Sequence, residues 1–229
     1  NKYCSLCISY VKMCILIMQK IQAKEIIGGD LSVTNKMPCK SFNLPAWECK
    51  TGSKLSKVKG SSCYNCYAKK GNYVRYPAVK KAQYKRLSQI MNPAWVDAMV
   101  NLIEREVKRI NESIFRWHDA GDIQHIPHLK NIVAVANKTP DVKHWIPTQE
   151  NKIVNDFIKA GGIIPDNLIV RISASMVNGK PPKNAKYTST VHTTKPIGHE
   201  CPASNQGGQC LSCRACWNTS IKNVSYKQH

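Results

Sequence analysis

Eight cysteines, gathered in two groups, are the residues best suited to chemistry. Toward the C-terminal end, Cys201, Cys210, Cys213 and Cys216 lie in the segment CPASNQGGQCLSCRACW, where the last three form a CxxCxxC run. Two intervening residues let neighbouring thiolates turn toward one metal, and the two glycines permit a sharp backbone path before the run. Three cysteines in series are typical of iron–sulfur ligation, whereas a zinc knuckle usually holds two CxxC pairs apart. We expect an iron–sulfur cluster of the 4Fe–4S type. Zinc is the alternative, and disulfides or free thiols are a third possibility.

A second cysteine group lies within residues 37–73, MPCKSFNLPAWECKTGSKLSKVKGSSCYNCYAKKGNY. The segment has no helical apolar period and is rich in Gly, Ser, Lys and Pro, which indicates a loop held by something other than a hydrophobic core. Its four thiols, Cys39, Cys49, Cys63 and Cys66, are predicted metal ligands. The alternative for the first two is that they are small buried side chains.

The charge of the chain points to a phosphate-bearing partner. The 229 residues carry 34 Lys and Arg against 14 Asp and Glu, a formal net charge of +20. Between residues 49 and 93 there are eleven basic residues and no acid. We expect a nucleic acid or a nucleotide to bind here, through Lys57, Lys59, Lys69, Lys70 and Arg75. The tyrosines between these basic residues would stack on bases or cover the cysteines. The alternative to nucleic-acid binding is a basic surface that only contacts solvent.

Strand and helix patterns alternate in the middle of the chain. Helices are predicted at residues 77–88, 93–111, 127–137 and 153–160, and strands at 113–117, 143–147 and 168–174. Repeated βα units imply a parallel sheet with its site at the C-terminal ends of the strands. The predicted fold class is α/β, a partial (β/α) barrel-like parallel sheet with cysteine-rich metal-binding loops at both ends.

Polar residues that follow the predicted strands are the candidates for a reaction. His118, Asp119, Asp122 and Glu150 are predicted catalytic residues, suited to proton transfer, to holding a ribose or to ligating a metal. Arg116, Arg171 and Ser173 are predicted to bind a cofactor. Arg116 and His118 lie two apart, so in a strand they would share a face. The alternative for the two aspartates is that they cap the next helix.

The predicted domain organisation is an N-terminal extension at residues 1–36 and a single metal-binding domain at residues 37–229. The domain comprises the cysteine-rich loop 37–73, the βα core 77–176 and the C-terminal cysteine cluster 199–217. Residues 178–199 are expected to be irregular, and residues 218–229 to be a polar tail without fixed structure unless the cluster anchors it. The apolar stretch near the start is too short to span a bilayer, so no membrane partner is expected. Cysteines clustered in CxxC pairs favour a reducing cytoplasm.

The motifs MPCKSFNLPAWEC, SSCYNCYAKKGNY, FRWHDAGDI, HWIPTQE, IVRISAS and CLSCRACW together resemble the bacteriophage gene 88 protein family. The likeness runs from about Met37 to the end of the chain. It implies a phage or prophage origin, with the host cytoplasm as location, and no particular reaction.

A weaker resemblance is to radical SAM enzymes, and it rests on the CxxCYA ending at residues 63–68. It implies a 4Fe–4S cluster on three cysteines, S-adenosylmethionine on the fourth iron and a partial βα barrel. The chain departs from that pattern, because thirteen residues rather than three separate Cys49 from Cys63. The C-terminal cysteines would then hold an auxiliary cluster, or both groups would share one centre. The rival function is a non-enzymatic, zinc-stapled nucleic-acid-binding protein.

Overall fold

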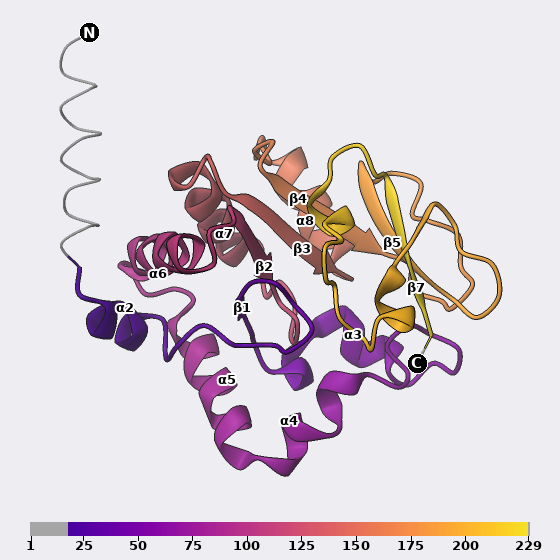
Figure 1. Ribbon diagram of the computed structural model, residues 1–229, viewed down its shortest axis with the longest axis horizontal. Coiled ribbons are helices and arrows are strands. Elements are labelled where there is room, and N and C mark those ends of the chain that lie inside the picture. Colours follow the sequence, from indigo (N-terminus) through magenta and orange to yellow (C-terminus); the bar gives the residue numbers. More distant parts are fainter. Residues whose placement is uncertain (1–17, 229) are drawn as a thin grey trace, which may run out of the picture.

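One open parallel sheet forms the centre of the protein in the computed structural model, which describes residues 18–228. Seven strands lie in the order β1-β2-β3-β4-β5-β7-β6, and every neighbouring pair is parallel (Figure 1). The strands are β1 Ser41–Phe42, β2 Ile114–Trp117, β3 Lys143–Thr148, β4 Leu168–Ser173, β5 Tyr187–His192, β6 His199–Glu200 and β7 Asn223–Lys227. The predicted α/β class and parallel sheet are confirmed, but the sheet is open, with β1 and β6 at its edges, rather than barrel-like. Residues 1–17 of the predicted extension lie outside the described residues.

The helices are α2 Lys20–Ile26, α3 Lys50–Leu55, α4 Asn72–Arg75, α5 Pro77–Gln89, α6 Trp95–Ile110, α7 Ile126–Lys138 and α8 Asn151–Lys159. Short 3-10 turns are η1 Ala46–Glu48, η2 Tyr67–Lys69, η3 Pro202–Asn205 and η4 Ala215–Trp217. The helices and strands predicted between residues 77 and 174 are present, with ends shifted by a residue or two. Over residues 18–228, no helix has both the length and the apolar composition that crossing a membrane requires.

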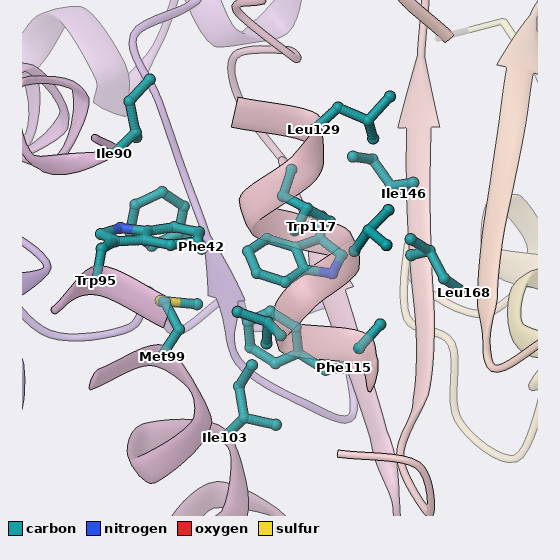
Figure 2. Close-up of a cluster of buried hydrophobic side chains, with 14 of the residues drawn as sticks. Phe42, Ile90, Trp95, Met99, Ile103, Phe115, Trp117, Leu129, Ile146 and Leu168 are labelled. Atoms are coloured by element: carbon teal, nitrogen blue, oxygen red, sulfur yellow. The ribbon is translucent and has the colours of Figure 1, made fainter. Parts of the chain in front are cut away.

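The main hydrophobic core lies between one face of the sheet and the helices. Phe115 and Trp117 of β2 point into this layer, where they pack edge to face at 5.1 Å between ring centroids. Phe42 of β1 meets Trp95 of α6 in the same geometry at 5.4 Å, and Figure 2 shows these rings among the aliphatic side chains of neighbouring elements. The buried Ile27, just after α2, belongs to the same core, which draws this part of the predicted extension into the domain. Large buried aromatic side chains thus fix the helix layer on this face.

The opposite face of the sheet is covered by the C-terminal segment rather than by helices. Trp145 of β3 packs against Trp217 of η4, with ring centroids 5.2 Å apart and planes at 77°. The indole N–H of Trp217 donates to the backbone oxygen of Phe115 at 2.9 Å. The segment that carries the C-terminal cysteines is therefore held directly against β2 and β3.

Four strands occur where the sequence predicts none: the two-residue β1 and β6, and the longer β5 and β7. β5 lies in the stretch expected to be irregular, and β7 lies in the expected polar tail. Their buried side chains are mostly hydroxyls and amides, which pair with one another: Thr190 donates to Ser225 at 3.0 Å, and Thr188 donates to Asn223 at 2.7 Å. Because these polar groups satisfy each other inside the fold, the two strands lack the apolar signature on which strand prediction depends.

Candidate metal centres

Three cysteines of the N-terminal region converge beside a glycine. A Cβ built on Gly52 would lie 3.7 Å from the Cys63 sulfur and 3.8 Å from the Cys49 sulfur. Cys49 and Cys66 pack against the same small cluster of buried alanines, and the charges of Cys66 and Cys63 act on the Cys49 thiol. We call Cys49, Cys63 and Cys66 the N-terminal thiol group. The absence of a side chain at Gly52 leaves the Cys49 and Cys63 sulfurs uncovered on this side, and the approach is close, because a Cβ here would lie 3.1 Å from the Cys49 Cβ.

The loops that carry the first two thiols of this group are tied to the end of β3. Two residues after the first cysteine, Thr51 donates to the carboxylate of Glu150 from its backbone N–H at 2.7 Å and from its hydroxyl at 2.8 Å. Directly before the second cysteine, the Ser62 hydroxyl accepts from the side-chain amide of Gln149 at 2.8 Å. Gln149 and Glu150 follow β3 immediately, so a strand end of the central sheet positions both loops.

The third thiol is tied to the end of β2. Directly after this cysteine, the Tyr67 hydroxyl donates to the backbone oxygen of Asp119. The Asp119 carboxylate accepts from the hydroxyl of Ser41 at 2.6 Å and from that of Tyr73 at 3.0 Å. Asp119 is therefore a junction between β1, the loop after β2 and the segment that follows the thiols.

Asp122 is one of three buried acids that are predicted catalytic residues. Its carboxylate accepts from the Thr148 hydroxyl at 2.5 Å and from the backbone N–H groups of Gln149 at 2.9 Å and Ile123 at 2.8 Å. Burial nevertheless raises the pKa of Asp122 to about 7, although these hydrogen bonds oppose the rise. The structure thus brings Asp119, Asp122 and Glu150 to the thiol group, each engaged in hydrogen bonds that join loops.

His118 points away from the thiols. Its backbone adopts a left-handed conformation with φ 50°, and its ring lies 5.4 Å from that of His128 in the helix layer. Neither ring nitrogen has a hydrogen-bond partner among the described residues, and burial lowers the pKa of His118 to about 3. The prediction that Arg116 and His118 share a face is wrong, because β2 ends at Trp117 and the chain turns at the next residue.

Arg116 lies on the sheet face opposite the helices, between the two cysteine groups. Its guanidinium stacks on the Trp145 ring at 4.7 Å. Burial alone would lower the pKa of Arg116, but nearby Tyr67, Asp119 and Tyr226 raise it. The side chain is therefore a permanent cation at the centre of the molecule.

The other four cysteines line one small, largely enclosed cavity. Cys201, Cys210, Cys213 and Cys216, together with Trp217, surround a volume of ≈ 20 Å³. We call these four cysteines the C-terminal thiol group. Backbone hydrogen bonds hold two of its members in place. The N–H of Cys201 donates to the oxygen of Ser225 in β7 at 2.8 Å, and the N–H of Cys210 donates to the oxygen of Lys36 at 2.9 Å. The group thereby joins β7, η4 and the loop before β1.

Arg171 is a predicted cofactor ligand. Its guanidinium instead donates hydrogen bonds to backbone oxygens near the C-terminal thiol group. The side chain is fully buried and donates to the carbonyl oxygens of Thr188, Ala215, Cys216, Asn218 and Lys222 at 3.1–3.4 Å. The third predicted cofactor residue, Ser173, exchanges a hydrogen bond with Ser189 at 3.0 Å. Arg171 therefore holds the loop that contains η4 onto the sheet.

Burial favours the protonated thiol of some cysteines in both groups. It raises the pKa of Cys63 to about 11 and that of Cys216 to about 12. Charges on neighbouring cysteines add to the rise in both cases. A metal that binds these thiols must therefore displace protons, as thiolate-bound metals do.

Cys39 stands apart from the N-terminal thiol group. It is buried in an apolar cluster with Ile114, Trp145 and Trp217, and burial raises its pKa to about 12. Among residues 18–228, no group of three or more His, Cys, Asp or Glu side chains is arranged as it would be around a bound metal ion. Metal binding by either thiol group remains a prediction.

The predicted phosphate-binding residues lie on the surface next to the N-terminal thiol group. Lys57, Lys59, Lys70 and Arg75 are exposed. Lys69 is half-buried and donates to the Ser53 hydroxyl at 3.2 Å. The rings of Tyr64, Tyr67 and Tyr76 are 45 to 58% exposed, so they are available for stacking.

Sequence reasoning missed the partners that hold the thiol loops. Thr51, Gly52 and Ser62 were not nominated, although each lies within three residues of a cysteine. That closeness was the available signal. The partners of Ser62 and Thr51 are Gln149 and Glu150, which lie 87 and 99 residues away in the chain. These pairs can be identified only once the order of the strands in the sheet is known.

Fold and site together define an α/β protein with one parallel sheet and a group of thiols on each of two loop regions around it. The chain belongs to the Gene product 88 family, whose model matches residues 16–219. The predicted membership in the bacteriophage gene 88 family is thus confirmed, and the match lends no support to the radical SAM resemblance. No curated protein and no solved structure matches the chain.

Proposed function

We propose that this protein is an iron–sulfur protein whose cluster is bound by the N-terminal thiol group and which acts on a nucleic acid or nucleotide. The observation that carries the proposal is the anchoring of all three thiol loops to the ends of β2 and β3. A loop that merely connects two elements needs no such ties. Three separate anchors hold three thiols over the C-terminal ends of parallel strands, which is where sites occur in sheets of this kind.

The residues present fit a cluster in donor type and in space. Three thiolates suit iron, and the missing side chain at Gly52 keeps the side of Cys49 and Cys63 open. Three buried alanines, with Tyr73 packed against them, form further surroundings of Cys49 and Cys66. A 4Fe–4S cluster held by three cysteines leaves one iron free to bind a ligand and to pass it an electron, with S-adenosylmethionine as the ligand to test first.

The residues around the thiols would orient and shield such a centre. Asp119 and Glu150 hold the loops in place through hydrogen bonds that are already formed. Asp122 is the best candidate to hold or release a proton, because its pKa of about 7 leaves both forms accessible near neutrality. Tyr67 and Tyr73 cover the side toward solvent, with their rings 6.1 Å apart.

The substrate class follows from the charge beside the thiols. Exposed lysines and Arg75 flank the same loops, and no acid lies between residues 49 and 93 to offset them. A phosphate-bearing molecule attracted to this surface would arrive next to the N-terminal thiol group. This proximity supports a nucleic acid or nucleotide as the substrate.

The test is the iron and sulfide content of protein produced and purified without oxygen. The wild type should contain both, with the broad visible absorption of an iron–sulfur cluster, and Cys63→Ala should lose most of this iron and sulfide. Cys39→Ala is the matched control, because it removes a buried thiol outside the group. Equal iron and sulfide in wild type and Cys63→Ala would refute the proposal.

A second variant distinguishes loss of the cluster from loss of the fold. Gly52→Leu keeps every thiol but fills the space beside Cys49 and Cys63. We expect this variant to lose the cluster while its circular dichroism stays that of the wild type. Retention of full iron and sulfide would show that the open space has no role.

A second candidate function is a non-enzymatic nucleic-acid-binding protein stapled by zinc. It is favoured by the exposure of α4, which buries none of its side chains, and of the basic residues around it. Such an element has a surface role rather than a core role. Zinc in place of iron and sulfide in the anaerobic preparation, bound through Cys63, would favour this function.

A further inference from the structure

We propose that the C-terminal thiol group is a separate site for one divalent metal ion, held by four thiolates, and that zinc is the ion it takes. The site is closed, so its role is to join three parts of the fold rather than to react. The inference is independent of the cluster proposed for the N-terminal thiol group. It assigns an iron–sulfur cluster to one cysteine group and a single zinc ion to the other.

The size of the cavity is the first reason for a single ion. Its volume of ≈ 20 Å³ has room for about one water-sized sphere. A 4Fe–4S cluster contains eight atoms, so it would require the residues that line this cavity to move apart. Trp217 and Val224, both almost fully buried, close the cavity, so enlarging it would disturb the packing of η4 and β7.

The number and position of the donors are the second reason. Four cysteines line the cavity, and four thiolates complete the tetrahedral shell of a structural zinc site and leave no open position. Cys210 and Cys213 form a tight turn in which the N–H of the second donates to the oxygen of the first at 2.9 Å. The sulfurs are not yet gathered around one point in the described residues, so the ion would have to draw Cys210 from its contact with the Met37 sulfur and Cys213 from its contact with His199.

Neighbouring groups compensate the charge that such a site would have. Four thiolates around a divalent ion carry a net charge of −2. The guanidinium groups of Arg116 and Arg171 are close enough to Cys216 to favour its thiolate form. The Tyr226 hydroxyl, 3.3 Å from the same sulfur, can donate a hydrogen bond to it. These partners supply the outer contacts that thiolate sites require.

The closed shell would connect distant parts of the chain. Cys201 is bonded through its backbone to β7, and Cys210 to Lys36 in the loop before β1. Cys216 lies in η4, whose backbone oxygens receive Arg171. One ion on these residues would link the two edge regions of the sheet across its helix-free face.

The experiment measures metal in the full-length chain from cells grown with cobalt in place of zinc. Wild-type protein should show the visible bands of tetrahedral cobalt bound to thiolates, with one ion in the C-terminal thiol group. Cys213→Ser should lose this ion, while Cys39→Ala should keep it. Cys63→Ala should leave the tetrathiolate signal intact, which separates this test from that of the N-terminal cluster.

Cys213→His keeps the inference testable if the serine variant fails to fold. Imidazole is itself a ligand, so this variant should retain one ion, with sulfur-to-cobalt absorption weaker by about a quarter because one of four thiolates is gone. Loss of sulfide together with iron in Cys213→Ser protein from iron-replete cells would overturn the single-ion site in favour of a cluster. An unchanged metal content in Cys213→Ser would overturn metal binding by this group.

Discussion

Three buried histidines are the most unusual residues of the helix layer. His118, His128 and His144 are each at most 3% exposed, and burial lowers the pKa of each well below its usual value, to about 3 for His118 and for His144. In the unfolded chain a histidine binds its proton near pH 6.5. Below that pH the unfolded state therefore holds more protons than the folded state, and stability falls as the pH falls toward the folded pKa. Above pH 6.5 these groups make no pH-dependent contribution.

His144→Gln should reduce this acid sensitivity. The amide can keep a hydrogen bond to Thr139, which now pairs with the ring at 2.8 Å, but it does not titrate. The free energy of unfolding, measured by urea titration at several pH values below 6.5, should fall less steeply than in the wild type, by at most about 1.4 kcal/mol per pH unit. The raised pKa of Asp122 acts with the opposite sign, but it is common to both proteins and cancels in the comparison. Parallel curves for the two proteins would contradict the prediction.

At the scale of elements, the turn after β2 depends on a glycine that touches the loop after β1. Gly121 has φ +83°, and a Cβ there would lie 2.6 Å from both the side chain and the backbone oxygen of Leu44. The same two segments are joined by a hydrogen bond of 2.9 Å from the Leu44 N–H to the oxygen of Ala120. The glycine therefore allows the turn that carries Asp119 and Asp122 to approach the first strand closely.

Gly121→Ala should destabilise the protein more than Gly161→Ala. Gly161 has nearly the same backbone conformation, with φ +81°, but nothing lies within 4 Å of its would-be Cβ. The conformational cost alone is about 1–2 kcal/mol, and the clash at Gly121 should add about 1–3 kcal/mol. Urea midpoints of the two variants measure the difference directly, and equal midpoints would show that the contact with Leu44 relaxes without cost.

The elements that could be predicted from sequence are those whose burial is apolar. The helix at residues 95–110 and the strand at 168–173 follow hydrophobic periodicity and occur as expected. β5 and β7 could not be found in this way, because hydroxyl and amide side chains fill their buried positions. The direction of His118 also escaped prediction, since a strand end is set by backbone conformation rather than by the residue pattern.

The candidate site was predictable as a set of residue types and not as an arrangement. CxxC spacing identified Cys63 with Cys66 and Cys210 with Cys213, and both pairs form tight turns. The convergence of Cys49 on the first pair, and the exclusion of Cys39 from it, depend on which loops lie over β2 and β3. Those contacts join residues far apart in the chain, which no local pattern encodes.

At the scale of the whole molecule, the charge is distributed asymmetrically in sequence and in space. Eleven basic residues lie between residues 49 and 93, and those of α4 and α5 extend from the body of the protein along one side (Figure 1). α5 buries only Gln83 and Arg86, so its lysines remain accessible. Under the proposed function, a phosphate-bearing strand would follow these exposed charges, with exposed tyrosines between them.

Replacing Lys57, Lys59 and Lys70 with alanine should weaken binding to a labelled single-stranded oligonucleotide and flatten its salt dependence. On single strands, the slope of log affinity against log salt should decrease in magnitude by about 0.7 for each lost contact. Fluorescence anisotropy over a salt series gives both quantities. The control is alanine at Lys108, Lys130 and Lys159, exposed lysines of α6, α7 and α8. Equal effects of the two triple variants would assign the attraction to net charge rather than to this surface.

The position of β7 between β5 and β6 imposes an order on biosynthesis. β6 pairs with β7 and not with any strand made before it, so residues 199–200 gain their sheet partner only after the ribosome has passed residue 227. The growing chain can assemble β1 to β5 and their helices during translation, but the helix-free face remains uncovered until the last strand docks. A nascent chain thus exposes Trp145 from the time this residue leaves the ribosome until the C-terminal segment docks, and early chaperone binding would act on this face first.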